Sequence, residues 1–145
     1  MKRLLIVFHS KTGGTLQMAQ AAAAGAGSEP EVAVNFIHAA EAGPDEMLEA
    51  DAYIFATPEN LAMMSGMMKD FFDRTYYPVL DRIVGRPYAM LICAGSDGEN
   101  AARQLVRIVT GWLRWVDDVE GNLISINVPN ASQRDGCAQR RFSPG

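Results

Sequence analysis

Residues 4–15 read Leu-Leu-Ile-Val-Phe-His-Ser-Lys-Thr-Gly-Gly-Thr, an apolar run of strand length followed by a polar turn with two glycines. A continuous branched apolar run is typical of a parallel strand that is covered on both faces. After the turn, Leu16, Ala19 and Ala22 recur at helical spacing, until glycines and a proline end the pattern before residue 31. This stretch therefore predicts a strand, a polar loop and a helix in succession.

The rest of the chain repeats this alternation. The expected strands cover residues 4–8, 32–37, 52–56, 88–94 and 123–128. Between them, helical patterns follow Leu16, open at Gly43-Pro44-Asp45, run from Met64 to Thr75, and run from Ala102 to Val116. Such alternation predicts a doubly wound α/β fold in one domain over residues 1–145. Because the tail after Pro129 is polar and poor in apolar periodicity, we expect a short or missing last helix.

Composition excludes several classes of function. A chain of 145 residues with 48% hydrophobic residues is long enough to bury its own core, so it needs no disulfide or metal. The net charge of −4 leaves no broad basic face, which argues against nucleic acid as a partner. Cys93 and Cys137 lack paired ligand spacing, and no apolar stretch is long enough to span a membrane. We expect a cytoplasmic protein without a metal site.

In doubly wound sheets the ligand lies beyond the carboxyl ends of the strands, where the strand order reverses. Here the corresponding loops are 9–15, 57–66 and 94–100. The first loop combines hydroxyl donors with glycines at the start of a helix, an arrangement that favours a phosphate. The alternative is that these residues only cap the helix. The GxxxxGK[ST] and GxGxxG patterns are absent, which argues against kinase and dehydrogenase functions.

The segment from Ser10 to Thr15 resembles the FMN phosphate loop of the flavodoxin superfamily. Thr57-Pro58-Glu59-Asn60, with the helix that follows, resembles the flavodoxin-like NAD(P)H-dependent FMN reductases and quinone reductases. The resemblance implies a five-stranded sheet of order 2-1-3-4-5 that binds FMN. It assigns the phosphate to Ser10, Thr12, Gly13, Gly14 and Thr15, with Lys11 exposed or marginal. It assigns the two edges of the isoalloxazine ring to Pro58, Glu59, Asn60 and Leu61, and to Ala94, Gly95 and Ser96.

The second and third loops contain no Trp, Tyr or Phe, so one face of the flavin ring is expected to be open. An open face suits an NAD(P)H-dependent oxidoreductase that passes hydride through FMN to a quinone, a flavin or a similar small acceptor. Such a reaction requires no catalytic side chain. Two alternatives remain: an electron carrier that serves a redox protein, and a relative that keeps the fold without binding flavin.

Other residues have simpler interpretations. His9, at the end of the first strand, is interpreted as structural, and His38, at the end of the second, as a surface residue. The methionines from 64 to 68 are interpreted as core, with Met63 as the exception. A polar tail would leave one face of the last strand uncovered around Leu123 and Ile126, which predicts a homodimer or marginal stability.

Overall fold

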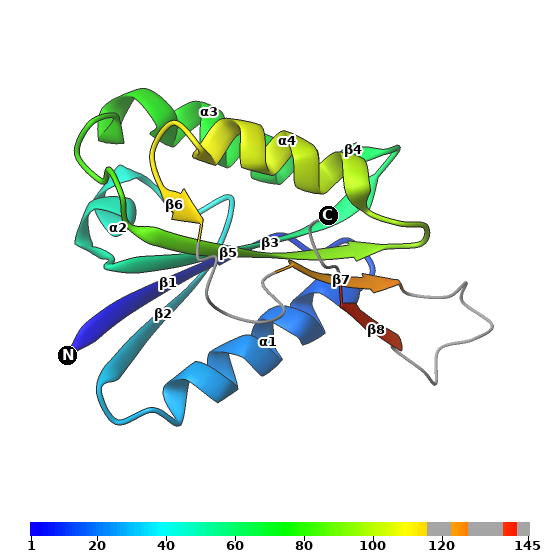
Figure 1. Cartoon of the computed structure of the whole chain (residues 1–145), viewed down its shortest axis with the longest axis horizontal. Coiled ribbons are helices and arrows are strands. Elements are labelled where there is room, and N and C mark those ends of the chain that lie inside the picture. The colour runs from blue at the N-terminus through cyan, green and yellow to red at the C-terminus, as the bar shows by residue number, and fades with distance from the viewer. Residues whose placement is uncertain (116–122, 128–137, 142–145) are drawn as a thin grey trace.

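The computed structural model describes residues 1–115, 123–127 and 138–141. Its sheet contains five main parallel strands in the order β2-β1-β3-β5-β7 (Figure 1). These strands are β1 (Lys2–Phe8), β2 (Val32–His38), β3 (Ala52–Asn60), β5 (Pro87–Ala94) and β7 (Leu123–Asn127). Counted along the chain, this is the expected order 2-1-3-4-5, and the flavodoxin-like fold class is confirmed.

Helices cover both faces of the sheet (Figure 1). Helix α1 (Gly14–Gly27) lies on one face, and α2 (Pro44–Glu49), α3 (Gly66–Val79) and α4 (Glu99–Val109) lie on the other. Because successive side chains of a strand point to opposite faces, Leu5 and Val7 belong to the core beneath α2, α3 and α4, whereas Ile6 packs with Met18 of α1. The continuous apolar run at the start of the chain is thus buried on both sides.

A β-hairpin occupies most of the loop expected over residues 57–66. Strand β3 continues to Asn60, and β4 (Met63–Met64) returns antiparallel to it after a two-residue turn. The helix expected from Met64 to Thr75 therefore begins later than predicted, because Met64 belongs to a strand. Helix α3 begins only after Ser65, whose Oγ accepts a hydrogen bond from the Met68 amide at 3.2 Å.

The helix expected from Ala102 to Val116 ends earlier, at Val109. Beyond it, Trp112 is buried with its ring stacked on Tyr76 at 4.8 Å, and β6 (Arg114–Trp115) pairs with β5. At Gly111 a Cβ atom would stand 2.8 Å from the Tyr76 hydroxyl. The spacing of apolar residues predicts a longer helix, but the packing of Trp112 on Tyr76 and the glycine at position 111 end it earlier. Val116 lies outside the described residues.

The tail contributes a strand that the sequence analysis did not predict. Strand β8 (Ala138–Arg141) pairs antiparallel with β7, with Asn127 opposite Ala138. The expectation of a short or missing last helix partly concerns residues 128–137 and 142–145, which lie outside the described part. The side chains of Leu123–Asn127 lie outside it as well. Over the described ranges, no helix combines the length and apolarity needed to cross a membrane.

Candidate functional site

The three predicted loops begin at neighbouring strands of the sheet. Strands β1, β3 and β5 are adjacent and parallel, so their carboxyl ends meet at the same edge. The His9 amide donates to the Ala56 carbonyl at 3.0 Å, and Pro58 lies opposite Cys93 in the register. The topology therefore brings loop 9–15, segment 58–61 and loop 94–98 to one edge.

The first loop leaves the start of α1 without a side-chain cap. Gly13 is the N-cap residue, with a left-handed φ of 101°, and no side chain of the described residues caps the first turn. Ser10 Oγ instead accepts from the Gly13 amide, within the loop, at 3.1 Å. The first turn also carries no acidic residue. A Ser or Thr that only capped the helix would occupy these amides, so this geometry argues against the simple capping interpretation.

The hydroxyl of Thr15 gives the strongest indication of a ligand at this loop. Its side chain is 1% exposed, and its hydroxyl is buried without a hydrogen-bond partner among the described residues. A buried hydroxyl without a partner is costly, so a group that supplies an acceptor here is favoured. Lys11 and Thr12 are exposed on the same loop. Free helix amides, a buried hydroxyl and the positive end of the helix dipole together fit a phosphate monoester.

The second segment forms the rim of this edge. Pro58 is buried, Glu59 and Asn60 are half-buried, and Leu61 is 97% exposed at the tip of the hairpin. The Glu59 carboxylate accepts a hydrogen bond from the Ala101 amide in α4, so the contribution of Glu59 to the rim is its backbone.

The third loop continues the rim from β5. Ala94 is buried at the end of the strand, whereas Gly95 and Ser96 are exposed. Asp97 Oδ1 accepts a hydrogen bond from the Glu99 amide at 2.9 Å, so this carboxylate caps the start of α4. Over residues 1–115, 123–127 and 138–141, no cluster of three His, Cys, Asp or Glu residues is placed to bind a metal ion.

Two residues that had no assigned role in the sequence hold the base of the hairpin. Thr57 and Ser65 are fully buried, and Thr57 Oγ1 accepts a hydrogen bond from the Ser65 amide at 3.1 Å. A serine that precedes an apolar helical pattern is a recognisable N-cap, so Ser65 had a local signal. Thr57 had none, because its partner is set by the fold of the hairpin.

His9 stands beside the phosphate-type loop. Its Nδ1 atom is buried without a described hydrogen-bond partner, and its ring meets that of His38 edge-on at 5.6 Å. Burial, together with the charges of His38 and Lys11, lowers the pKa of His9 from its ordinary value. The neutral imidazole is therefore favoured.

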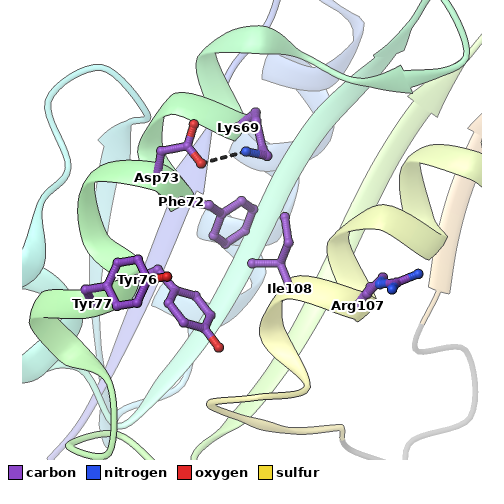
Figure 2. A pocket seen from close by; sticks show the side chains of 7 residues that line it. All are labelled: Lys69, Phe72, Asp73, Tyr76, Tyr77, Arg107 and Ile108. Atoms are coloured by element: carbon purple, nitrogen blue, oxygen red, sulfur yellow. Dashed lines mark hydrogen bonds and ion pairs between the residues drawn. The ribbon is translucent and has the colours of Figure 1, made fainter.

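A separate groove lies between α3 and α4 (Figure 2). It measures about 260 Å³, and it is lined by Lys69, Phe72, Asp73, Tyr76, Tyr77, Arg107 and Ile108. Small-molecule pockets measure about 300–1,000 Å³, and none of these residues belongs to the three loops. The edge formed by the loops, rather than this groove, is the candidate site.

A parallel sheet of this order, with an uncapped helix start after β1, defines the class of flavodoxin-like α/β proteins. The profile described as NADPH-dependent FMN reductase matches residues 28–125. The chain belongs to the NADPH-dependent FMN reductase family.

Individual relatives agree with this class. The chain is 33% identical over 96 residues to a flavodoxin of Aquifex aeolicus, covering 66% of this chain and 50% of the relative. It is 35% identical over 95 residues to an NAD(P)H dehydrogenase (quinone) of Acidithiobacillus ferrooxidans, covering 52% and 48%. The chain thus spans about half the length of these relatives.

A solved structure supports the fold. The flavodoxin, WrbA-like protein from Agrobacterium tumefaciens superposes with a TM-score of 0.73 at 24% identity, covering 93% of this chain and 89% of that one. At this identity the likeness shows the fold alone.

Proposed function

We propose that the chain binds FMN and acts as an NAD(P)H-dependent oxidoreductase that passes electrons to a quinone or a similar small acceptor. The observation that carries the proposal is the buried Thr15 hydroxyl, which lacks a partner among the described residues at the uncapped start of α1. The family match and the quinone dehydrogenase relative support the same activity.

The proposal gives each segment a distinct task. Thr15, Ser10 and the first-turn amides of α1 hold the phosphate, with Thr12, Gly13 and Gly14 completing the loop and Lys11 at its exposed rim. A Cβ atom at Gly13 would meet no heavy atom within 4 Å beyond its chain neighbours, so the loop leaves open space for the ligand there. Because a phosphate is held mainly by neutral donors, its charge is balanced by the helix dipole rather than by a buried lysine.

The other two segments orient the ring. Pro58, Glu59, Asn60 and Leu61 border one edge, and Ala94, Gly95 and Ser96 border the other. Bound FMN supplies the hydride chemistry. No aromatic side chain occurs in residues 57–62 or 94–100, so the protein leaves room for a planar partner above the ring. The protein groups bind and orient, and no side chain is assigned the role of acid or base.

An absorbance titration tests the proposal. Purified protein is titrated with FMN, and the flavin band is then followed under anaerobic conditions on addition of NADH, and separately of NADPH. Stoichiometric binding followed by rapid bleaching is the expected result. Bound flavin that neither nucleotide reduces indicates the flavodoxin-type electron carrier instead, and the relative from Aquifex aeolicus is named a flavodoxin. No binding at all indicates a fold without a flavin and overturns the proposal.

The proposal includes a cytoplasmic location, where reduced nicotinamide nucleotides are supplied, and a homodimer. The homodimer is motivated by the sequence, in which only a polar tail follows the last strand with its apolar residues Leu123 and Ile126. Sedimentation equilibrium at micromolar concentration checks the dimer, and a monomeric mass contradicts it.

A further inference from the structure

The Glu59 side chain links two of the segments at the candidate site. It belongs to β3, but its Oε2 atom accepts a hydrogen bond from the Ala101 amide of α4 at 3.2 Å. Gly98, the N-cap residue of α4, has no side chain with which to cap the helix. Ala101 is the third residue of α4, a position whose amide has no acceptor within the helix. A carboxylate from another element therefore caps α4 here, 42 residues away along the chain.

Two further hydrogen bonds join the hairpin to the same helix. Asn100 Nδ2 donates to the Ala62 carbonyl, and the Met64 amide donates to Gln104 Oε1 at 3.0 Å. The outgoing strand, the turn and the returning strand of the hairpin thus each have one bond to the first half of α4. The hairpin is fixed to the helix at three points.

This attachment connects two loops that are far apart in the sequence. Segment 58–61 lies in the hairpin, and loop 95–98 runs directly into α4. We propose that Glu59 is a positioning residue that holds these two flanks of the flavin ring in a fixed relation through its cap on α4. The inference rests on the proposed function. It assigns to the Glu59 side chain a role beyond its backbone contact with the ring.

The cap is expected to act on the ring rather than on the phosphate. The phosphate loop belongs to β1 and α1, which Glu59 does not contact through any described hydrogen bond. Loss of the cap should therefore weaken FMN and riboflavin to the same extent. It should also change the reduction potential of the bound flavin, because the backbone groups along the ring edge tune that potential.

The test compares Glu59→Ala, Glu59→Gln and Glu46→Ala. Glu46 offers a matched control, since its Oε2 accepts the Gly43 amide at 2.8 Å at the start of α2, outside the three loops. For each variant, the dissociation constants of FMN and riboflavin, the flavin reduction potential and the free energy of unfolding are measured.

Glu59→Ala should weaken both flavins by about tenfold or more, the scale of one hydrogen bond to a charged group, and shift the potential. Glu59→Gln should restore both, because its amide oxygen can accept the same bond. Glu46→Ala should lower stability and leave flavin binding and potential unchanged.

A Glu59→Ala variant that loses stability but keeps both affinities and the potential overturns the inference, while wild-type FMN binding still upholds the proposed function. Failure of the wild type to bind FMN overturns the proposed function itself. If Glu59→Ala does not fold, Glu59→Asp keeps the charge but shortens the side chain by one methylene, which draws the carboxylate away from the Ala101 amide. Unchanged riboflavin affinity and potential in that variant then overturn the inference, and a change in both supports it.

Discussion

The hydroxyl of Thr57 accepts a hydrogen bond from the amide of Ser65 at 3.1 Å, and both side chains are fully buried. The same hydroxyl also lies 2.9 Å from the Pro58 carbonyl oxygen. The bond between Ser65 and Thr57 closes the β3–β4 hairpin at its base. Ser65 Oγ in turn caps the start of α3 by accepting a hydrogen bond from the Met68 amide. One buried threonine thus supports both the rim of the candidate site and the helix that follows it.

We predict that Thr57→Val lowers the free energy of unfolding by about 1–3 kcal/mol, because the buried Ser65 amide loses its acceptor. Thr75→Val is the control. Thr75 is equally buried, but among the described residues its hydroxyl bonds only to the Phe71 carbonyl, one turn back in α3, which already accepts a backbone bond within the helix. This control substitution should lower the free energy of unfolding by less than about 1 kcal/mol. Urea denaturation measures both values, and equal losses contradict the prediction.

Thr15→Val is predicted to affect stability and binding differently. Its buried hydroxyl has no described partner, so its removal should leave the free energy of unfolding unchanged or slightly raised. FMN affinity should nevertheless fall by about 1–3 kcal/mol, the scale of one lost buried hydroxyl contact. Riboflavin, which lacks the phosphate, should bind the variant and the wild type equally. Calorimetric titration with the two flavins checks this, and unchanged FMN affinity refutes the phosphate assignment.

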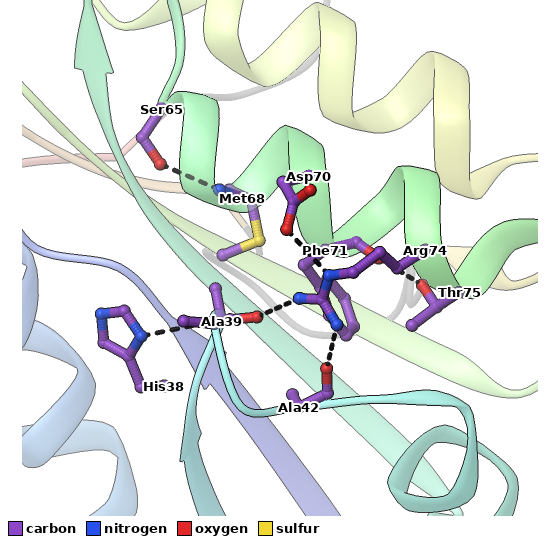
Figure 3. A network of polar contacts seen from close by, with 10 residues as sticks. His38, Ala39, Ala42, Ser65, Met68, Asp70, Phe71, Arg74 and Thr75 are labelled. Atoms are coloured by element: carbon purple, nitrogen blue, oxygen red, sulfur yellow. Dashed lines mark hydrogen bonds and ion pairs between the residues drawn. The ribbon is translucent and has the colours of Figure 1, made fainter.

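Arg74 is predicted to stabilise the loop after β2 (Figure 3). Its guanidinium donates to the Ala39 carbonyl at 2.6 Å and the Ala42 carbonyl at 2.9 Å, while Nε donates to Asp70 at 2.8 Å. Because these bonds join α3 to another segment, Arg74→Ala should lower the free energy of unfolding by about 1–3 kcal/mol.

Lys69→Ala on the same helix provides the comparison. Lys69 pairs with Asp73 four residues later, and both side chains are more than half exposed. An exposed pair of this kind contributes about 0.3–0.5 kcal/mol. If Lys69→Ala lowers the free energy of unfolding as much as Arg74→Ala does, the hydrogen bonds from Arg74 to the loop after β2 do not contribute to stability.

The lowered pKa of His9 predicts a pH dependence of stability. Between this lowered pKa and the ordinary value of about 6.5, the unfolded chain binds more protons than the folded chain. The free energy of unfolding should therefore fall as the pH is lowered through this window. His9→Gln should flatten the dependence. The titration midpoint of His9, followed by NMR, should rise in His38→Gln, where one neighbouring charge is removed, and an unmoved midpoint contradicts this.

The main fold could be predicted because its signals are local. The apolar run 4–8, the glycine turn after it and the regular alternation of strand and helix patterns predict the doubly wound α/β class and the position of the phosphate-type loop. Each of these signals lies within a few residues. The sheet order 2-1-3-4-5 came from the family resemblance, and the structure confirms it. The uncapped helix start and the buried Thr15 hydroxyl then agree with the ligand chemistry that those residues suggest.

The missed features depend on contacts between distant residues. The cap from Glu59 to Ala101 crosses 42 positions, and the end of α4 is set by packing of Trp112 against Tyr76 of another helix. Strand β8 pairs through its backbone with β7, and a polar sequence gives little sign of such pairing. Hydrophobic periodicity carries none of this information.

The turn between β3 and β4 also lacks its usual sequence signal. Leu61 and Ala62 both have left-handed backbones, with φ values of 50° and 64°, where Asn-Gly is the common pair in a two-residue hairpin. Ala62→Gly should therefore raise the free energy of unfolding by about 0.5–1 kcal/mol. An engineer who screens for heat resistance should recover this substitution early. If such variants are more heat-stable but turn over more slowly, the strained turn is needed for activity. Natural selection has then favoured catalytic rate over stability at this edge of the sheet.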